Sequence, residues 1–179
     1  LKDADACIAA STPGPGVIEK DEVDGMAEDA ILFATANPTP EIMPEEAKEA
    51  GVRIVGTGRS DFPNQINNSL GFPAVFRGAL DVQASDITDG MCVAAARAIA
   101  ERAEEIGLEE DFVIPTMDDM EMYLRTALSV ARAAIDEGVA RKEVPEKKLE
   151  EKIGKGLLDP RRLTRFYWKK VLFRAFQID

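Results

Sequence analysis

Three short apolar runs constrain the fold of this chain more than any other feature. They cover residues 6–10, 30–36 and 52–56, and each runs directly into a loop rich in Gly, Pro or Asn. Continuous apolar runs of this length are typical of parallel strands buried on both faces. The intervals between the runs are long enough for helical crossovers. The sequence therefore predicts an α/β fold with a partial, Rossmann-like parallel sheet of about three strands.

Helical patterns fill the intervals and dominate the chain after residue 70. Short helices are expected within 18–29 and over 45–50, where Pro44 suits the first helical position. Longer helices are expected over 72–82, 89–106 and 118–137, and Thr88 is placed to cap the second of these. The apolar stripe expected on the helix 118–137 comprises Met120, Leu124, Leu128, Ala131 and Ile135. The chain is thus expected to continue as a helical C-terminal region.

The loops that follow the three runs are the candidate ligand-binding segments. Right-handed crossovers place the carboxyl ends of parallel strands at one edge, so loops 11–16, 37–40 and 57–68 are expected to converge on one crevice. The third loop combines glycines with several amides and opens a helical segment near Asn67 and Asn68. A helix N-terminus at that point would favour a carboxylate or a phosphate.

The domain organisation is predicted as three successive segments. Residues 1–112 form half of a nucleotide-binding domain, residues 113–142 a closing helical segment, and residues 143–179 a charged linker with a basic aromatic terminal helix. The linker is expected to be a solvated helix after Pro145. The terminal helix suits docking on an acidic neighbour or subunit, with a membrane surface as the alternative.

Composition narrows the function. The chain has 179 residues and a net charge of −11, with 33 acidic against 22 basic residues, which argues against nucleic-acid binding. There is neither a signal peptide nor an apolar run long enough for a membrane, so a cytoplasmic protein is expected. Without histidine, chemistry would depend on carboxylates, amides, Lys, Tyr or a cofactor. Cys7 and Cys92 are interpreted as buried thiols.

Three motifs give the chain a resemblance to a known family. They are the Ser-Thr-Pro-Gly loop at 11–14, the run Ala-Asn-Pro-Thr-Pro-Glu-Ile at 36–42, and Thr-Gly-Arg-Ser-Asp-Phe-Pro-Asn-Gln-Ile-Asn-Asn at 57–68. With the helix that ends at Arg141, they make residues 1–141 resemble malic enzymes of the shorter prokaryotic and archaeal kind. That family oxidises and decarboxylates malate to pyruvate and carbon dioxide with NAD or NADP.

The resemblance implies roles for particular residues. Asn37 would contact both the nicotinamide ribose and the substrate, and Asn68 would donate a hydrogen bond to the substrate carboxylate. The residues implied in cofactor binding are Ser11, Thr12, Gly14, Asn37 and Asn67. A neutral amide suits this work, because it orients a carboxylate without competing for the metal.

The resemblance also shows what this chain lacks. The family uses a Tyr and a Lys for proton transfer, acidic metal ligands, and a Gly-x-Gly-x-x-Gly turn, all from an earlier part of the protein. The chain is therefore expected to be the C-terminal part, with the N-terminal half removed or supplied by another chain. Alone it is predicted to be inactive. A divalent Mg or Mn ion would be bound mainly by residues outside this chain, and a homo-oligomer is expected.

Two other functions remain open on the residues alone. The chain could be a non-catalytic assembly module acting through an exposed sheet edge and its basic tail, or the nucleotide domain of another dehydrogenase, such as an amino-acid dehydrogenase. Individual residues also have ordinary interpretations. Asn67 and Asn68 could cap a helix, Asn37 could start a turn, and Arg59 could bind an anion or form a surface ion pair. Asp5 and Asp61 are expected to be solvated rather than metal ligands.

Overall fold

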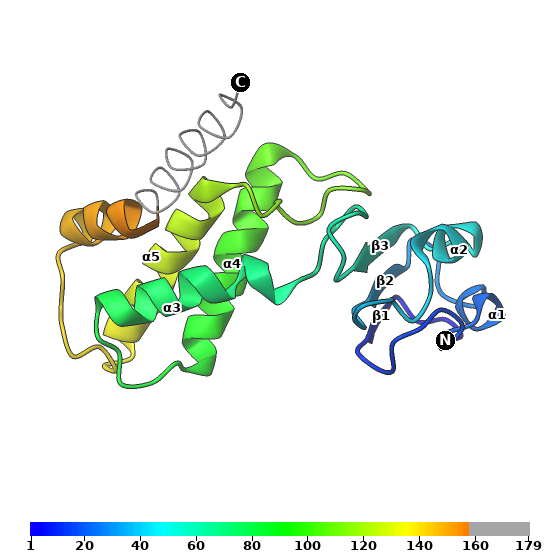
Figure 1. Ribbon diagram of the computed structural model, residues 1–179, viewed down its shortest axis with the longest axis horizontal. Coiled ribbons are helices and arrows are strands. Elements are labelled where there is room, and N and C mark those ends of the chain that lie inside the picture. Colours follow the sequence, from blue (N-terminus) through cyan, green and yellow to red (C-terminus); the bar gives the residue numbers. More distant parts are fainter. Residues whose placement is uncertain (158–179) are drawn as a thin grey trace, which may run out of the picture. The chain divides into compact units, whose positions relative to one another are not determined.

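The computed structural model describes residues 1–157, which form two compact units (Figure 1). Unit 1 comprises Leu1–Leu70 and Ile99–Met117, and unit 2 comprises Gly71–Ala98 and the described residues 118–157. The predicted basic aromatic helix of the tail lies outside the described residues.

Unit 1 contains a three-stranded sheet in which all strands are parallel (Figure 1). Its strands, in spatial order, are β1 (Ala6–Ala9), β2 (Ile31–Ala34) and β3 (Ile54–Thr57). Leu32 pairs with Cys7 on one side and with Val55 on the other, so the three strands are in register. This confirms the predicted partial Rossmann-like sheet.

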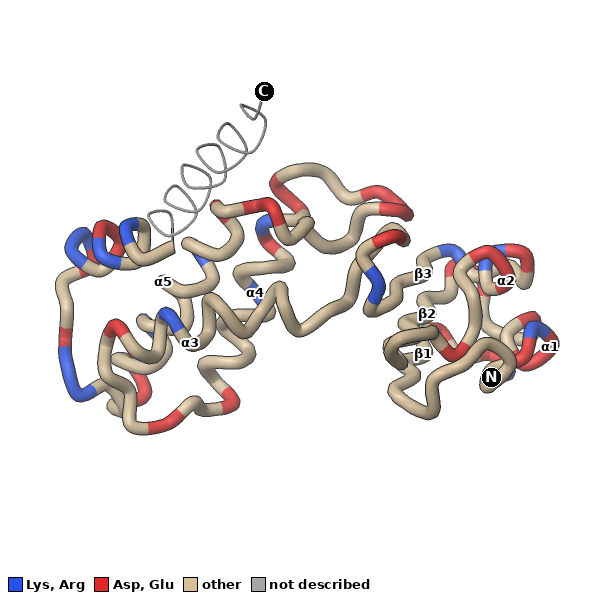
Figure 2. The backbone as a smooth tube through the Cα atoms, in the orientation of Figure 1, with Lys and Arg blue, Asp and Glu red and all other residues tan. Residues whose placement is uncertain are grey.

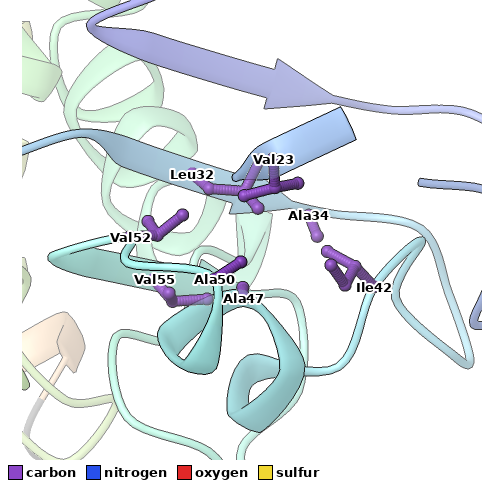
Figure 3. Close-up of a cluster of buried hydrophobic side chains, with 8 residues drawn as sticks. All are labelled: Val23, Leu32, Ala34, Ile42, Ala47, Ala50, Val52 and Val55. Carbon is purple, nitrogen blue, oxygen red and sulfur yellow. The ribbon is translucent and has the colours of Figure 1, made fainter. Parts of the chain in front are cut away.

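One face of the sheet is covered by two short helices. These are α1 (Lys20–Val23) and α2 (Pro44–Glu49), and Pro44 occupies the first turn of α2 as expected. Gly51, with φ of +93°, follows α2 in a conformation that favours glycine. The core between the helices and the sheet, seen in Figure 3, comprises Val23, Leu32, Ala34, Ile42, Ala47, Ala50, Val52 and Val55.

The opposite face of the sheet is less covered than the sequence predicts. Ile8 is 75% exposed, and Ile31, Phe33 and Ile54 are only half-buried among the described residues. The expectation of strands buried on both faces is therefore wrong for this part of the chain. The physical reason is that α1 and α2 both pack on the face that carries Leu32 and its neighbours.

Several acidic residues of unit 1 lie on α1 and α2 (Figure 2). Asp21 and Glu22 lie in the first turn of α1, and Glu45 and Glu46 lie in the first turn of α2. Such acids interact favourably with the N-terminal end of a helix. The acidic composition is thus partly explained by local helix stability.

Unit 2 is built from helices. They are α3 (Phe72–Asp81), the first part of α4 (Asp89–Ile106), α5 (Met120–Asp136) and a further helix over 146–157. The Met91 N–H donates to Thr88 Oγ at 3.2 Å, which confirms Thr88 as the cap of α4. Asp119 caps α5 by accepting a hydrogen bond from the Met122 N–H at 3.0 Å.

The buried face of α5 differs from the predicted stripe. Met120, Leu124, Leu128 and Ile135 are only half-buried. The buried residues are Met122, Tyr123, Thr126, Ala127, Val130, Ala131 and Ala134. This face contains several alanines because α3 packs closely against α5 at Gly78. A Cβ placed on Gly78 would lie 2.9 Å from Val130 Cβ and would also clash with the Ala127 carbonyl oxygen.

Substitution of Gly78 by alanine is expected to lower the free energy of unfolding by about 2 kcal/mol, because the two backbones must separate. Chemical denaturation of the wild type and the Gly78→Ala variant measures this. Gly154→Ala is the matched control, because no atom lies within 4 Å of a Cβ built there and the residue is helical. The control should be neutral or slightly stabilising. Equal stability of the two variants would contradict the close approach.

Two further expectations need correction. In the helix over 146–157, Leu149 and Ile153 are 1% and 0% exposed, so this part of the predicted linker is packed rather than solvated. Cys92 is exposed on α4, and Cys7 is half-buried, so the interpretation of both as buried thiols is wrong. Across residues 1–157, no helix has both the length and the apolar character needed to cross a membrane.

Candidate functional site

The loops that follow β1 and β2 are joined by a buried carboxylate. Glu41 is 0% exposed, and its Oε1 accepts hydrogen bonds from the Ser11 N–H at 2.7 Å and from Ser11 Oγ at 3.1 Å. Its Oε2 accepts from the Ala36 N–H at 3.1 Å. A backbone hydrogen bond from the Gly14 N–H to the Thr39 carbonyl, at 3.2 Å, joins the same two loops. The first two candidate loops therefore converge.

The loops that follow β2 and β3 also meet. The Asn37 side chain lies against Gly58, so that a Cβ on Gly58 would be 3.2 Å from Asn37 Nδ2. Arg59 Nη1 donates to the Pro38 carbonyl at 3.5 Å. The predicted convergence of the three loops at the carboxyl ends of the strands is confirmed within unit 1.

The neighbouring amides Asn67 and Asn68 have different environments. Asn67 Nδ2 donates to the Gly58 carbonyl at 2.9 Å, and its Oδ1 accepts from the Ser69 N–H at 2.9 Å. Asn67 thus holds the loop together at Gly58. Asn68 begins the single 3-10 turn η1 (Asn68–Leu70) and is exposed. One turn provides little of the helix dipole that the sequence suggested here.

The structure places the residues implied in ligand binding at the surface of unit 1. Ser11, Thr12, Asn37 and Asn68 are exposed. Gly14 has φ of +139°, and no atom lies within 4 Å of a Cβ built there. An open backbone without a side chain is what close approach of a dinucleotide requires. The individual roles of these residues stay predictions.

A hollow of about 450 Å³ lies beside the first loop. Pro15 and Gly16 line it together with Lys20, Glu46 and Glu49. None of the residues implied in ligand binding lines this hollow. The hollow is therefore not the crevice that the sequence predicts.

Arg59 forms an ion pair, as one of its two interpretations predicts, and the other, a contact with an anion, stays a prediction. Its Nε donates to Asp61 Oδ1 at 2.8 Å and its Nη2 to Asp61 Oδ2 at 2.5 Å, while the guanidinium lies 5.2 Å from the centre of the Phe62 ring. The hydrogen bonds from Arg59 lower the pKa of Asp61. Both carboxylate oxygens accept a hydrogen bond from Arg59, and the Asp61 side chain is 56% exposed. Within residues 1–157, no group of three or more acidic or Cys side chains could hold a metal ion.

Two buried polar residues were missed in the sequence. Asn64 is 5% exposed; its Nδ2 donates to the Val55 and Glu110 carbonyls at 3.0 and 2.8 Å, and its Oδ1 accepts from the Val113 N–H at 2.8 Å. Glu41 is the other residue. The sequence signal that could have indicated the burial of Glu41 is its position between two apolar residues, Pro40 and Ile42, both of which are buried.

Glu41 is stabilised in its charged form. Burial raises the pKa of its carboxyl. Hydrogen bonds from the backbone of Ser11, Ala36 and Glu41 itself, and from the Ser11 hydroxyl, together lower the pKa by more than burial raises it. The pKa of Glu41 therefore lies below its ordinary value of 4.5. Backbone N–H donors favour the carboxylate over the neutral acid. This carboxylate is therefore expected to be ionised throughout the physiological range.

Acidification is expected to remove the contribution of Glu41 to stability. Because its folded-state pKa is lower than its unfolded-state pKa, the contribution is complete above the unfolded value and is lost as the pH falls through the folded value. The free energy of unfolding should therefore differ between the wild type and Glu41→Gln at neutral pH, and the difference should shrink below about pH 4.5. Denaturation at several pH values measures it, with Glu45→Gln as the exposed control. A difference that stays constant or grows on acidification would contradict this.

Comparison with known proteins agrees with the arrangement of the loops. Residues 9–135 match the family model for the NAD binding domain of malic enzyme. The chain is 51% identical over 155 residues to a bifunctional malic/malolactic enzyme of Bacillus subtilis, covering 87% of this chain and 37% of that protein. It is 49% identical over 143 residues to an NAD-dependent malic enzyme of Geobacillus stearothermophilus, covering 80% of this chain and 29% of that protein.

The fold agrees as well. The crystal structure of a malic enzyme from Entamoeba histolytica matches with a TM-score of 0.92 and 45% identity, covering 94% of this chain and 35% of that one. The chain thus spans 29% to 37% of the length of these relatives. The family model covers most of the sequence, and the parallel sheet and its loops have the expected order. The chain therefore belongs to the malic enzyme family.

Proposed function

We propose that this chain is the part of a malic enzyme that binds the dinucleotide and positions the substrate carboxylate. The observation that carries the proposal is the joining of three loops, through Glu41, Gly58 and Arg59, at the carboxyl ends of β1, β2 and β3. Ligands of open α/β folds bind at this edge of the sheet. Each loop also carries a residue implied in ligand binding by the sequence motifs.

The reaction would oxidise malate at C2 and release carbon dioxide to give pyruvate. NAD or NADP, when bound, supplies the hydride acceptor. The residues of this chain would bind and orient: Ser11, Thr12 and Gly14 along the dinucleotide, and Asn37 beside the nicotinamide ribose and the substrate. Asn68 would donate an amide N–H to the substrate carboxylate, which fixes the direction of C2 toward the nicotinamide.

The divalent metal and the proton-transfer groups would come from other residues. The described part of this chain offers no group of three or more acidic or Cys side chains that could hold a metal ion. We therefore expect the chain to need a further part, equivalent to the length of its relatives that it does not span. That part and this chain together are called the complete enzyme below. A cytoplasmic homo-oligomer acting on malate is the expected form.

The test is malate-dependent reduction of NAD and of NADP, with Mn²⁺ present, followed by the absorbance of the reduced dinucleotide. The isolated chain should show no activity, and the complete enzyme should be active. Recovery of activity on mixing this chain with the separately expressed remainder would support the division of roles. Activity of the isolated chain would show that the proton-transfer groups have been misplaced, and an inactive complete enzyme would contradict the proposed function.

A second candidate, a non-catalytic assembly module, is favoured by one observation. Among the described residues β1 pairs only with β2, so its other edge is unpaired, and Ile8 on the less covered face of the same strand is 75% exposed. An unpaired strand edge beside an exposed apolar side chain is a site for association. An inactive complete enzyme that nevertheless forms a stable complex through this edge would favour the module.

A further inference from the structure

We propose that Glu41 is a positioning residue that fixes the distance between the two dinucleotide-binding loops. This inference rests on the proposed function, because it assigns a role to a residue that would not itself touch a ligand. Glu41 is completely buried, whereas Ser11, Thr12 and Asn37 are exposed. Its place in the chain is directly after the Asn37 loop, and its contacts extend back to Ser11, thirty residues earlier.

The two carboxylate oxygens divide between the two loops. Oε1 accepts both hydrogen bonds from Ser11, after β1, and Oε2 accepts the hydrogen bond from the Ala36 N–H, directly before Asn37. Two backbone N–H groups from separate segments therefore point at one side chain. The charged acceptor makes these bonds stronger than bonds between neutral groups.

Only a carboxylate of this length can accept hydrogen bonds from Ser11 and from the Ala36 N–H at the same time. Glutamine offers one acceptor oxygen and one NH₂ group, so in either orientation a donor faces one of the two backbone N–H groups. A buried N–H without an acceptor is costly, and the loop that carries it would move. Aspartate keeps both acceptors but is one methylene shorter, so it cannot reach Ser11 and Ala36 together at the observed distances.

Backbone hydrogen bonds reinforce the same connection. The Gly14 N–H donates to the Thr39 carbonyl and the Ile18 N–H to the Glu41 carbonyl, both at 3.2 Å. With these bonds, Glu41 would hold Ser11 and Asn37 at a fixed separation, and such preorganisation reduces the cost of ordering loops around a dinucleotide.

The test compares Glu41→Gln with Glu45→Gln in the complete enzyme, well below the melting temperature of each. The KM for the dinucleotide should rise about tenfold in Glu41→Gln, while kcat at saturating dinucleotide stays within about threefold of the wild type. The dissociation constant of the dinucleotide, measured by fluorescence titration, should rise by the same factor. Glu45→Gln makes the same change on the exposed surface of α2 and should leave both quantities unchanged.

Glu41→Asp carries the test if the glutamine variant does not fold, and it should also raise the dinucleotide KM. A folded Glu41→Gln or Glu41→Asp enzyme with wild-type dinucleotide affinity would overturn the proposal. Failure of both variants to fold would also overturn it, because the role of Glu41 would then be purely structural. Failure of the proposed function is recognised separately: the wild-type enzyme would then show no malate-dependent reduction.

Discussion

Replacement of Asn68 by alanine in the complete enzyme is expected to lower kcat/KM for malate by about 10- to 100-fold. A hydrogen bond from a neutral donor to a carboxylate contributes about 1.5–3 kcal/mol, and each 1.4 kcal/mol corresponds to a factor of ten. The melting temperature should hardly change, because Asn68 is exposed in the turn η1 and surface substitutions usually alter stability by less than about 0.5 kcal/mol. Steady-state kinetics with malate and a thermal melt measure the two quantities.

Ser60→Ala is the matched control for Asn68. Ser60 is an exposed polar residue in the same loop after β3, and its replacement should leave kcat/KM for malate unchanged. Wild-type kinetics in Asn68→Ala would remove Asn68 from the site. A loss of activity that only follows a loss of folded protein would likewise contradict a direct contact with the substrate.

Replacement of Asp81 by alanine is expected to lower the free energy of unfolding by about 3 kcal/mol. Asp81 lies at the end of α3 and is 0% exposed. Its Oδ2 accepts from Arg77 Nε at 2.6 Å, and its Oδ1 lies 2.9 Å from Lys152 Nζ, which also donates to the Asp81 backbone carbonyl at 3.1 Å. The carboxylate thus links α3 to the helix over 146–157. Its removal would leave Arg77 and Lys152, whose side chains are 30% and 46% exposed, without their common partner.

Urea denaturation of unit 2 in the wild type and in Asp81→Ala measures this loss. Asp136→Ala, at the exposed end of α5, is the control and should change stability by less than about 0.5 kcal/mol. Asp81→Ala should also expose Leu149 and Ile153, because the helix over 146–157 that carries them loses its ion pair between Lys152 and Asp81. A loss of unfolding free energy in Asp81→Ala as small as that of the control would show that the ion pairs of Asp81 are no stronger than surface ion pairs.

Periodicity and local signals were sufficient for the main strands and helices of residues 1–157. The three apolar runs became β1, β2 and β3, and Pro44 and Thr88 mark the starts of α2 and α4 as expected. The convergence of the three loops also followed from the sequence, because right-handed crossovers leave few alternatives for consecutive parallel strands.

The details that depend on tertiary packing could not be predicted in this way. The buried face of α5 is set by the approach of Gly78, which lies more than forty residues earlier in the chain. The predicted residues Leu124 and Leu128 are only half-buried, whereas Ala127 and Val130 lie at the close contact with Gly78. The partly uncovered face of the sheet similarly depends on where two short helices pack.

The candidate site depends on the family motifs. The resemblance singled out Asn37 and Asn68, which are exposed in the loops after β2 and β3, and their roles stay predictions. Glu41 and Asn64 were missed, because their partners are backbone groups, which the sequence does not identify. Glu41 looks like an ordinary surface acid until Ser11 and Ala36 are seen to donate to it.

The positions of Asn37 and Asn68 around a bound ligand test this account most directly. A crystal structure of the complete enzyme with NAD(P) and malate should place the amide nitrogens of both residues roughly 3 Å from acceptor atoms of the ligands, in one shared pocket. The two amides on opposite sides of the molecule, or a malate bound away from both, would contradict the assignment of this chain to the positioning of malate.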